Sequence, residues 1–216
     1  MDLVALISLW AFDKELFRAI HVGLRREFLD PIFLLITYTG DGFIQIPTIL
    51  FLAFHKKTRA LGLAVIAAFA TSGLIRLLIK DLVDRPRPSN FEWADPVRFP
   101  VPLDGFLKHL LDTVPYGNSS FPSGHATTSF AIAFMVAWWV RGSDWAWVGW
   151  AAVLWATLVG FSRVYVGVHY PFDIVGAAGL AAMVSTGLFL WWGKKGWAPR
   201  DVEPSVPIQK ETGQTE

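Results

Sequence analysis

Three short polar clusters, at residues 80–88, 121–125 and 162–173, contain the side chains in this sequence that are best suited to binding and catalysis. Lys80, Arg87 and Arg163 supply three fixed positive charges to them. An arginine presents a planar fork that matches phosphate oxygens, whereas a lysine presents a point charge. These residue types indicate a binding site for phosphate.

The second cluster has the sequence of a helix start. Pro122 and Ser123 are typical of the first residues of a helix, so the backbone amides of Gly124 and His125 have no partner within it. The positive end of the helix dipole points the same way, and such a terminus binds anions. Ser123 adds a hydroxyl, and Gly124, which has no side chain, lets an oxyanion approach the backbone closely.

Two histidines and one carboxylate add reactivity to this phosphate site. A neutral imidazole can attack phosphorus. Asp173 follows His169 by four residues, so it can accept a hydrogen bond from one ring nitrogen and leave the other with a free lone pair. Pro171 favours a helix start, where the dipole stabilises the ionised form of Asp173. His125 would stand across the phosphate and protonate the leaving oxygen as a general acid.

Each cluster alone also has a purely structural explanation. An Arg-Pro pair near a membrane is usually a snorkelling charge beside a turn. A Pro-Ser-Gly-His run is a capped helix start, and the third cluster would suit an interfacial anchor with a structural His–Asp pair. The occurrence of all three, each at the end of an apolar segment, favours a functional site.

The segments that position these clusters have the composition of membrane helices. The chain has 216 residues, 53% of them hydrophobic, and a mean hydropathy of +0.42, which excludes an ordinary soluble domain. A bilayer span needs roughly 20 apolar residues, and backbone groups inside lipid must pair within a helix. We expect an all-α membrane bundle of about five to six transmembrane helices, with spans near residues 31–54, 60–79, 123–140, 145–161 and 172–192.

The chain on either side of the bundle differs in character. Residues 1–29 include an amphipathic stretch, residues 13–28, which we expect to lie on the membrane surface as a helix. A sixth span is the alternative, but its four basic residues would each cost about 2.5–3.5 kcal/mol at the bilayer centre. Residues 30–193 form the predicted membrane domain, and residues 194–216 a polar tail expected to be disordered.

Alternating loops place all three polar clusters on one membrane face. The loop at residues 55–59 and the start of the tail at Lys194 and Lys195 share the opposite face. Basic loops mark the cytoplasmic side, so the site is predicted to face the periplasm or the cell exterior. The long loop on the site side has a short helical pattern at residues 106–111, either an interfacial helix or a simple cover.

The three clusters, in order, resemble the signature of the type 2 phosphatidic acid phosphatase family, the lipid phosphate phosphatases, and point to a bacterial membrane member. That signature reads Lys-x6-Arg-Pro, Pro-Ser-Gly-His and Ser-Arg-x5-His-x3-Asp, and the resemblance spans about residues 30–192. Its fixed positions are all matched, by Lys80, Arg87, Pro88, Pro122, Ser123, Gly124, His125, Ser162, Arg163, His169 and Asp173.

The resemblance implies a role for each matched residue. His169 would be the nucleophile, His125 the acid and Asp173 the group that orients His169. The phosphate would be bound by Lys80, Arg87, Ser123, Gly124 and Arg163. Arg85 lies outside the signature and is interpreted as an auxiliary charge.

The predicted function is therefore hydrolysis of a lipid phosphate or diphosphate through a phosphohistidine, without a metal or other cofactor. The best candidate substrate is a polyprenyl diphosphate such as undecaprenyl diphosphate, since cationic groups favour the more highly charged lipid. Phosphatidic acid and phosphatidylglycerol phosphate are the alternatives. The expected partners are this lipid and the bilayer, with no nucleic acid, and the oligomeric state is left open.

Two other classes of protein compete with an enzyme. An anion transporter would need a polar path through the bilayer, yet Arg76, near a helix end, is almost the only charge within the predicted spans. A phosphatase-like protein that only binds lipid phosphate would be expected to lack a catalytic histidine or aspartate, and none is missing here.

Overall fold

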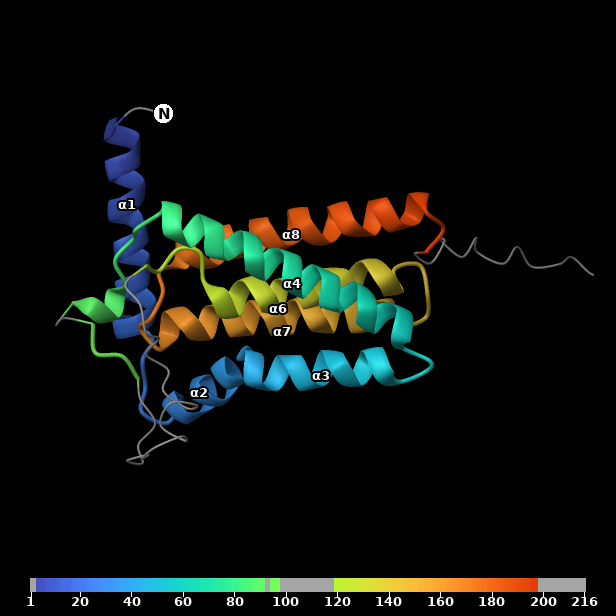
Figure 1. The fold of residues 1–216 in the computed structure, drawn as a ribbon. Helices are drawn as coiled ribbons and strands as arrows, with labels where there is room; N and C mark the ends of the chain where they lie inside the picture. The colour runs from blue at the N-terminus through green and yellow to red at the C-terminus, as the bar shows by residue number, and fades with distance from the viewer. Residues whose placement is uncertain (1–2, 92–93, 98–118, 198–216) are drawn as a thin grey trace, which may run out of the picture.

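The computed structural model describes residues 3–91, 94–97 and 119–197, and its regular elements there are helices (Figure 1). The predicted helix at residues 106–111 and the tail beyond residue 197 lie outside these ranges. The elements are α1 (Leu3–Arg18), the π-helix η1 (Ala19–Gly23), α2 (Asp30–Thr39), α3 (Gly42–Phe54), α4 (Arg59–Leu82), the short 3-10 helix η2 (Pro88–Asn90), α6 (Gly124–Val140), α7 (Ala146–Tyr165) and α8 (Pro171–Lys194).

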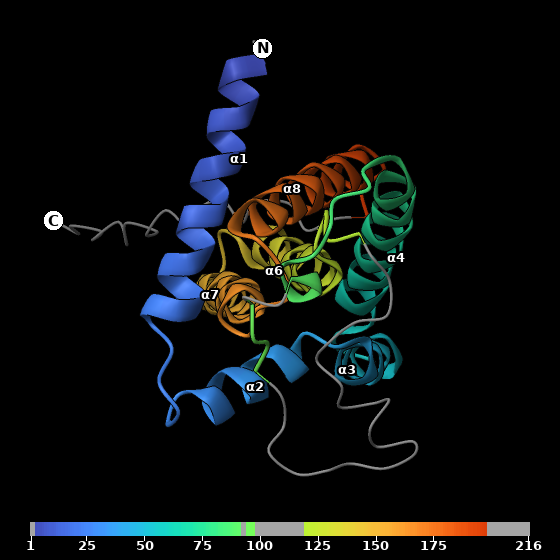
Figure 2. The ribbon, with the colours of Figure 1, turned by 90° about the vertical axis from the view of Figure 1, so that its left-hand side faces the viewer.

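Helix α6 forms the centre of the bundle. It is apolar on almost every side, which is the pattern of a helix surrounded by others. Figure 2 shows the bundle end on, with α6 between α4, α7 and α8. Ala131, Ala133 and Met135 of α6 are fully buried, and Ala177 and Ala181 of α8 join the same core. Ala177 and Ala181 are small residues four positions apart, a spacing that allows close helix packing.

The outer helices present apolar side chains to their surroundings, as a membrane bundle must. Leu78 of α4, Trp150 of α7 and Met183 of α8 are among the large exposed hydrophobic residues. Helices α4, α7 and α8 are each long and apolar enough to cross a bilayer, and α2 with α3 makes a fourth span if the bent pair counts as one. The structure thus confirms the predicted class, a helical membrane bundle.

The predicted span at residues 31–54 is wrong as a single straight helix. It divides into α2 and α3, whose axes differ by 46°. Asp41 adopts an extended conformation at the break, and its side chain caps α3 by accepting a hydrogen bond from Phe43 N at 2.8 Å. Gly40 packs so closely on α7 that a Cβ there would lie 2.4 Å from Val159. This break places Asp41 at the end of the bundle, with its side chain 35% exposed.

The N-terminal helix also differs from its predicted bounds. Helix begins at Leu3, not near residue 13, and continues through η1 to Gly23, whereas residues 24–29 are not helical. Figures 1 and 2 show α1 crossing the end of the bundle, not running along it. The interpretation of residues 1–29 as a surface segment stays a prediction. Two of its own residues, Asp13 and Phe17, are fully buried, so one face of α1 packs on the bundle.

Candidate active site

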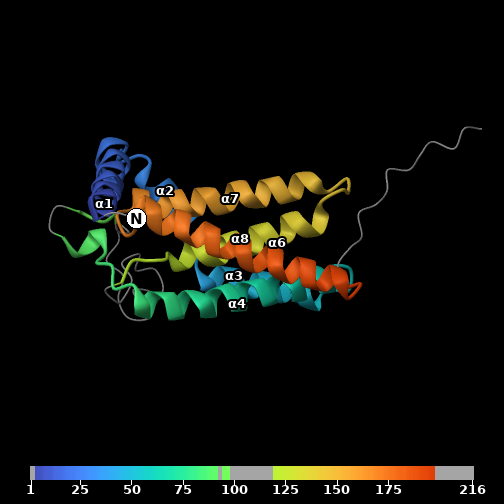
Figure 3. The same ribbon diagram turned by 90° about the horizontal axis from the view of Figure 1, so that it is seen from above.

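The three polar clusters meet at the end of the bundle that α1 crosses. The C-terminal end of α4, the N-terminal ends of α6 and α8, and the C-terminal end of α7 all lie there (Figures 1 and 3). Every candidate residue of the signature belongs to one of these ends or to the segments joining them. The alternation of up and down helices produces this convergence, as the loop pattern predicts.

His169 lies at the centre of a hydrogen-bonded chain. Its Nε2 is 3.1 Å from Arg87 Nη1, and its Nδ1 is 3.4 Å from Asp173 Oδ2. A guanidinium can only donate, so Nε2 must accept and the ring proton must be on Nδ1, facing Asp173. The lone pair of Nε2 is therefore directed at a cation that can hold a phosphate. This is the tautomer that an attacking imidazole needs.

The short segment between α7 and α8 fixes where His169 stands. Val168 N and His169 N both donate to the carbonyl of Arg163, at 3.2 and 3.3 Å, which folds the chain back on α7. Gly167 makes this turn with φ of +87°, a region that favours glycine. A Cβ at Gly167 would lie 2.7 Å from Cε1 of His21, so η1 packs directly on the turn.

The surroundings of His169 keep its imidazole neutral. Burial lowers its pKa well below the usual 6.5, and the positive charges of Arg87 and Arg163 lower it further. Burial also lowers the pKa of Arg87, to about 10, which leaves that guanidinium charged at neutral pH. At neutral pH the site therefore combines an uncharged imidazole with a charged guanidinium.

The start of α6 has the form that the sequence predicts. Ser123 occupies the N-cap position, and Gly124 is the first helical residue. The hydroxyl of Ser123 is fully buried and has no hydrogen-bond partner within the described residues. A buried hydroxyl without a partner is unfavourable, so an incoming oxyanion would supply the missing hydrogen-bond acceptor. Lys80 lies half-buried at the end of α4, where its charge adds to that of Arg87.

Two residues from the α2–α3 segment complete the site, and sequence reasoning missed both. Thr37 accepts a hydrogen bond from Nη1 of Arg163 at 3.0 Å, so α2 holds this arginine in place. Asp41 Oδ2 lies 3.4 Å from His125 Nε2. The carboxylate can accept a hydrogen bond from Nε2 and so orient the imidazole of the acid candidate. The only sequence signal was an aspartate at a glycine-marked break in an apolar stretch.

Arg85 is not the auxiliary charge that the sequence indicated, because it is a structural link. Its Nη1 donates to Asp173 Oδ1 at 2.6 Å, and its Nη2 donates to Asp13 of α1. The guanidinium contacts the rings of both Trp10 and Tyr170, 4.4 and 4.3 Å from their centroids. Asp13 also accepts a hydrogen bond from Phe172 N at 3.0 Å, at the start of α8. Helix α1 therefore takes part in holding Asp173.

Both carboxylate oxygens of Asp173 accept hydrogen bonds in this arrangement. Oδ2 accepts from Tyr170 N at 2.9 Å as well as facing His169, and Oδ1 is held by Arg85. The carboxylate cannot rotate without breaking one of these contacts, so it fixes the orientation of the imidazole. Within the described residues, no group of three or more His, Asp or Glu side chains is arranged to hold a metal ion.

A membrane helix bundle that gathers two histidines, their aspartate partners and several cations at one end has the arrangement of a membrane phosphatase. The chain belongs to the PAP2 superfamily, whose family model matches residues 61–197. It is 27% identical to an undecaprenyl-diphosphatase of Sulfolobus acidocaldarius over 176 residues, covering 81% of this chain and 75% of the relative.

Two Bacillus subtilis proteins give similar comparisons. The undecaprenyl-diphosphatase BcrC is 29% identical over 180 residues, which cover 80% of each chain. The crystal structure of a transmembrane PAP2 type phosphatidylglycerolphosphate phosphatase matches with a TM-score of 0.67 and 24% identity, covering 87% of both chains. The match to this crystal structure establishes the fold.

We predict that Arg85→Lys lowers kcat with little effect on KM. A lysine keeps the charge but cannot donate to Asp13 and Asp173 in the same fork, so Asp173 loses its fixed position. A small misplacement of a catalytic group costs about tenfold or more in rate. Arg25→Lys, at an arginine that pairs with Asp30 and Asp95 away from His169, is the matched control. A raised KM with unchanged kcat would instead assign Arg85 to substrate binding.

We also predict that His169 stays neutral through pH 6.5 in the ligand-free protein. Its pKa is lowered by burial and by neighbouring cations, so protonation is expected only well below that pH. NMR of isotope-labelled histidines in detergent micelles measures this directly, with the His169 signal assigned as the one missing from His169→Ala. Titration of that signal at or above pH 6.5 would contradict the electrostatic picture.

Proposed function

We propose that this membrane lipid phosphatase hydrolyses a polyprenyl diphosphate, such as undecaprenyl diphosphate, through a phosphohistidine on His169. The observation that carries the mechanism is the position of the His169 imidazole. Its Nε2 lone pair faces Arg87 at 3.1 Å while Asp173 engages Nδ1 at 3.4 Å. A nucleophile, the residue that orients it and a phosphate-binding cation are thus in contact before any substrate arrives.

The proposed reaction has two steps. In the first, Nε2 of His169 forms a bond to the terminal phosphorus as the bond from phosphorus to the bridging oxygen breaks. The electron pair stays on that oxygen, and His125 gives it a proton, so lipid monophosphate leaves. In the second, water attacks the phosphohistidine with His125 as base, which releases inorganic phosphate and restores the imidazole. Lys80, Arg87 and Arg163 stabilise the charge that develops on the phosphoryl oxygens.

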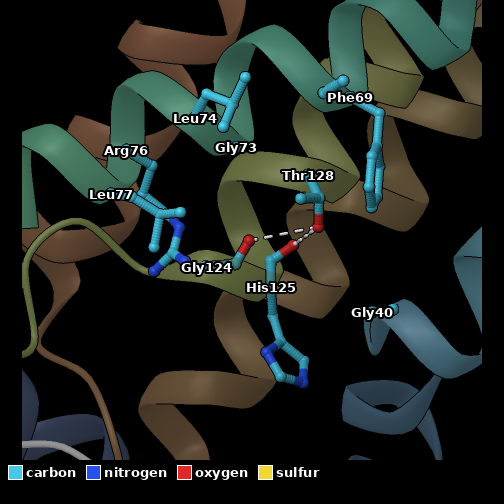
Figure 4. A pocket seen from close by; sticks show the side chains of 11 residues that line it. Gly40, Phe69, Gly73, Leu74, Arg76, Leu77, Gly124, His125 and Thr128 are labelled. Carbon is cyan, nitrogen blue, oxygen red and sulfur yellow. Dashed lines mark hydrogen bonds between the residues drawn. The ribbon is translucent and has the colours of Figure 1, made fainter.

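The assignment of a lipid substrate agrees with the place of the site. A cavity of about 510 Å³ opens beside His125 and Gly124, between α4, α6 and the α2–α3 break (Figure 4). Away from these two residues its lining is largely apolar, with Phe69, Leu74 and Leu77 from α4. A headgroup phosphate can reach the histidines while its hydrocarbon chain stays with the apolar surface. Two relatives named as undecaprenyl-diphosphatases support a polyprenyl diphosphate.

Charge neutralisation by protein side chains makes a metal ion unnecessary in this proposal. Three cations from the signature surround the phosphate position, and phosphoryl transfer depends chiefly on such positioning and electrostatic stabilisation. Full activity is therefore expected in the presence of EDTA. Vanadate, which adopts the five-coordinate geometry of the transition state, is expected to inhibit.

The first test is to trap the intermediate. With a substrate labelled in its terminal phosphate and EDTA present, rapid quenching should give labelled protein whose label is lost in acid but kept in base. His169→Ala should lose the label and lower kcat by about a thousandfold or more. His55→Ala, at an exposed loop on the opposite end of the bundle, is the control and should behave as wild type. Retention of a tenth of the activity in His169→Ala would exclude the proposed nucleophile.

We propose further that the site faces away from the cytoplasm, because the loop at the other end of the bundle is basic. The chain contains no cysteine, so single cysteines can report the orientation. Asp84→Cys, exposed beside the site, should react in intact cells with a thiol reagent that does not cross membranes. Lys57→Cys, exposed in the loop between α3 and α4, should react only after the cells are opened. The opposite pattern would reverse the topology.

The substrate itself is tested by comparing kcat/KM for undecaprenyl diphosphate, phosphatidic acid and phosphatidylglycerol phosphate in the same mixed micelles. The diphosphate is expected to have the highest value, because the cationic site interacts more strongly with the more highly charged headgroup. If either glycerolipid is the better substrate, the polyprenyl proposal is wrong, and the assignment as a lipid phosphatase stands.

A further inference from the structure

Arg76 is a cation of the site that lies outside the family signature. It is four residues before Lys80 on α4, so it occupies the same face of the helix one turn further into the bundle, about 6 Å along the axis. Figure 4 shows its guanidinium against Gly124, on the wall of the cavity that His125 also lines. A Cβ at Gly124 would lie 3.3 Å from its Nη1 and 3.4 Å from its Cζ.

The charge of Arg76 is not compensated within the described residues, where it has no hydrogen-bond or ion-pair partner. Its side chain is half-buried. It lies against the first residue of α6, at the positive end of that helix dipole, which disfavours another positive charge. It also repels the charges of Lys80 and Arg87, and this repulsion adds to the effect of burial on the pKa of Arg87. An arginine held there without an anion is costly, so a bound anion is expected to stabilise it.

A snorkelling role does not explain this placement. A snorkelling arginine extends its head towards the membrane surface and water. Arg76 instead packs on the backbone of α6 beside the general-acid candidate, where a leaving group must emerge. Leu74 and Leu77 line the same cavity, so Arg76 lies close both to His125 and to the apolar surface available to a hydrocarbon chain.

We propose that Arg76 binds the phosphate that remains on the lipid when a diphosphate is hydrolysed, and thereby makes the site prefer diphosphates to monophosphates. This inference rests on the proposed function. The terminal phosphate is transferred to Nε2 of His169, and the inner phosphate departs on its bridging oxygen towards His125. The guanidinium of Arg76 can donate hydrogen bonds to this phosphate and stabilise the negative charge that it gains as the bridging bond breaks. A lipid monophosphate has no second phosphate to meet Arg76.

The test compares two substrates that share one hydrocarbon chain, farnesyl diphosphate and farnesyl monophosphate, in the same detergent. Arg76→Gln should lower kcat/KM for the diphosphate by about tenfold or more, the loss expected for a hydrogen bond between charged groups. The monophosphate value should stay near that of wild type. Arg76→Lys keeps the charge without the fork, so it should recover part of the diphosphate value.

Two further variants serve as controls. Arg59→Gln removes an exposed arginine from the opposite end of the same helix and should change neither value. Lys80→Gln removes a cation of the signature and should lower both, because both substrates place a phosphate at His169. Thermal unfolding in detergent checks each variant. If Arg76→Gln is unfolded, Arg76→Lys decides the matter, since it must lower the diphosphate value selectively.

The possible outcomes separate this inference from the proposed function. An equal loss for both substrates in Arg76→Gln would mean that Arg76 acts on the transferred phosphate, and no loss would mean that it is only a snorkelling charge. Either result overturns the inference while the phosphatase assignment stands. If the wild-type enzyme hydrolyses only the monophosphate, both the polyprenyl diphosphate proposal and the role of Arg76 are wrong.

Discussion

The carboxylate of Asp173 connects three separate segments of the chain, namely the turn into α8, the segment at Arg85 and, through Arg85, helix α1. It accepts from the backbone of Tyr170 and from Arg85, and it faces Nδ1 of His169. Arg85 in turn connects it to Asp13 of α1. A buried ion pair is costly unless its members have further hydrogen bonds. Here Asp13 and Asp173 each accept one from a backbone amide, whereas Nε of Arg85 has no partner within the described residues. The position of α1, the turn before α8 and the orientation of the imidazole all depend on this one carboxylate.

A second constraint is the excess of positive charge at this end of the bundle. Lys80, Arg87 and Arg163 meet at the positive end of α6, and Arg76 lies one turn deeper on α4. The rigid helices hold these groups together despite their repulsion. The free-energy cost of bringing these like charges together is therefore met when the protein folds. An anionic substrate then binds to a site that needs little rearrangement. The depressed pKa of His169 is another result of the same charges.

The predicted parts of the molecule follow from local rules. Apolar length indicated α4, α6, α7 and α8, because bilayer thickness and backbone pairing leave few alternatives. Alternation of the spans was enough to bring Lys80, His125 and His169 to one end. The errors fell where packing overrode apolar length. Residues 31–54 read as one helix, but contact with α7 and the cap at Asp41 break it, and neither effect is visible in hydrophobicity.

The sequence by itself determined the membrane class, the signature residues and the face on which they gather, because hydrophobic length and helix-start residues act over a few positions. Only the tertiary structure decided that Asp13 and Arg85 hold Asp173, that Asp41 faces His125 and that Arg76 covers Gly124. In each of these pairs the two partners lie far apart along the chain. Such contacts depend on how whole helices cross and pack, and no local pattern of residues records that geometry.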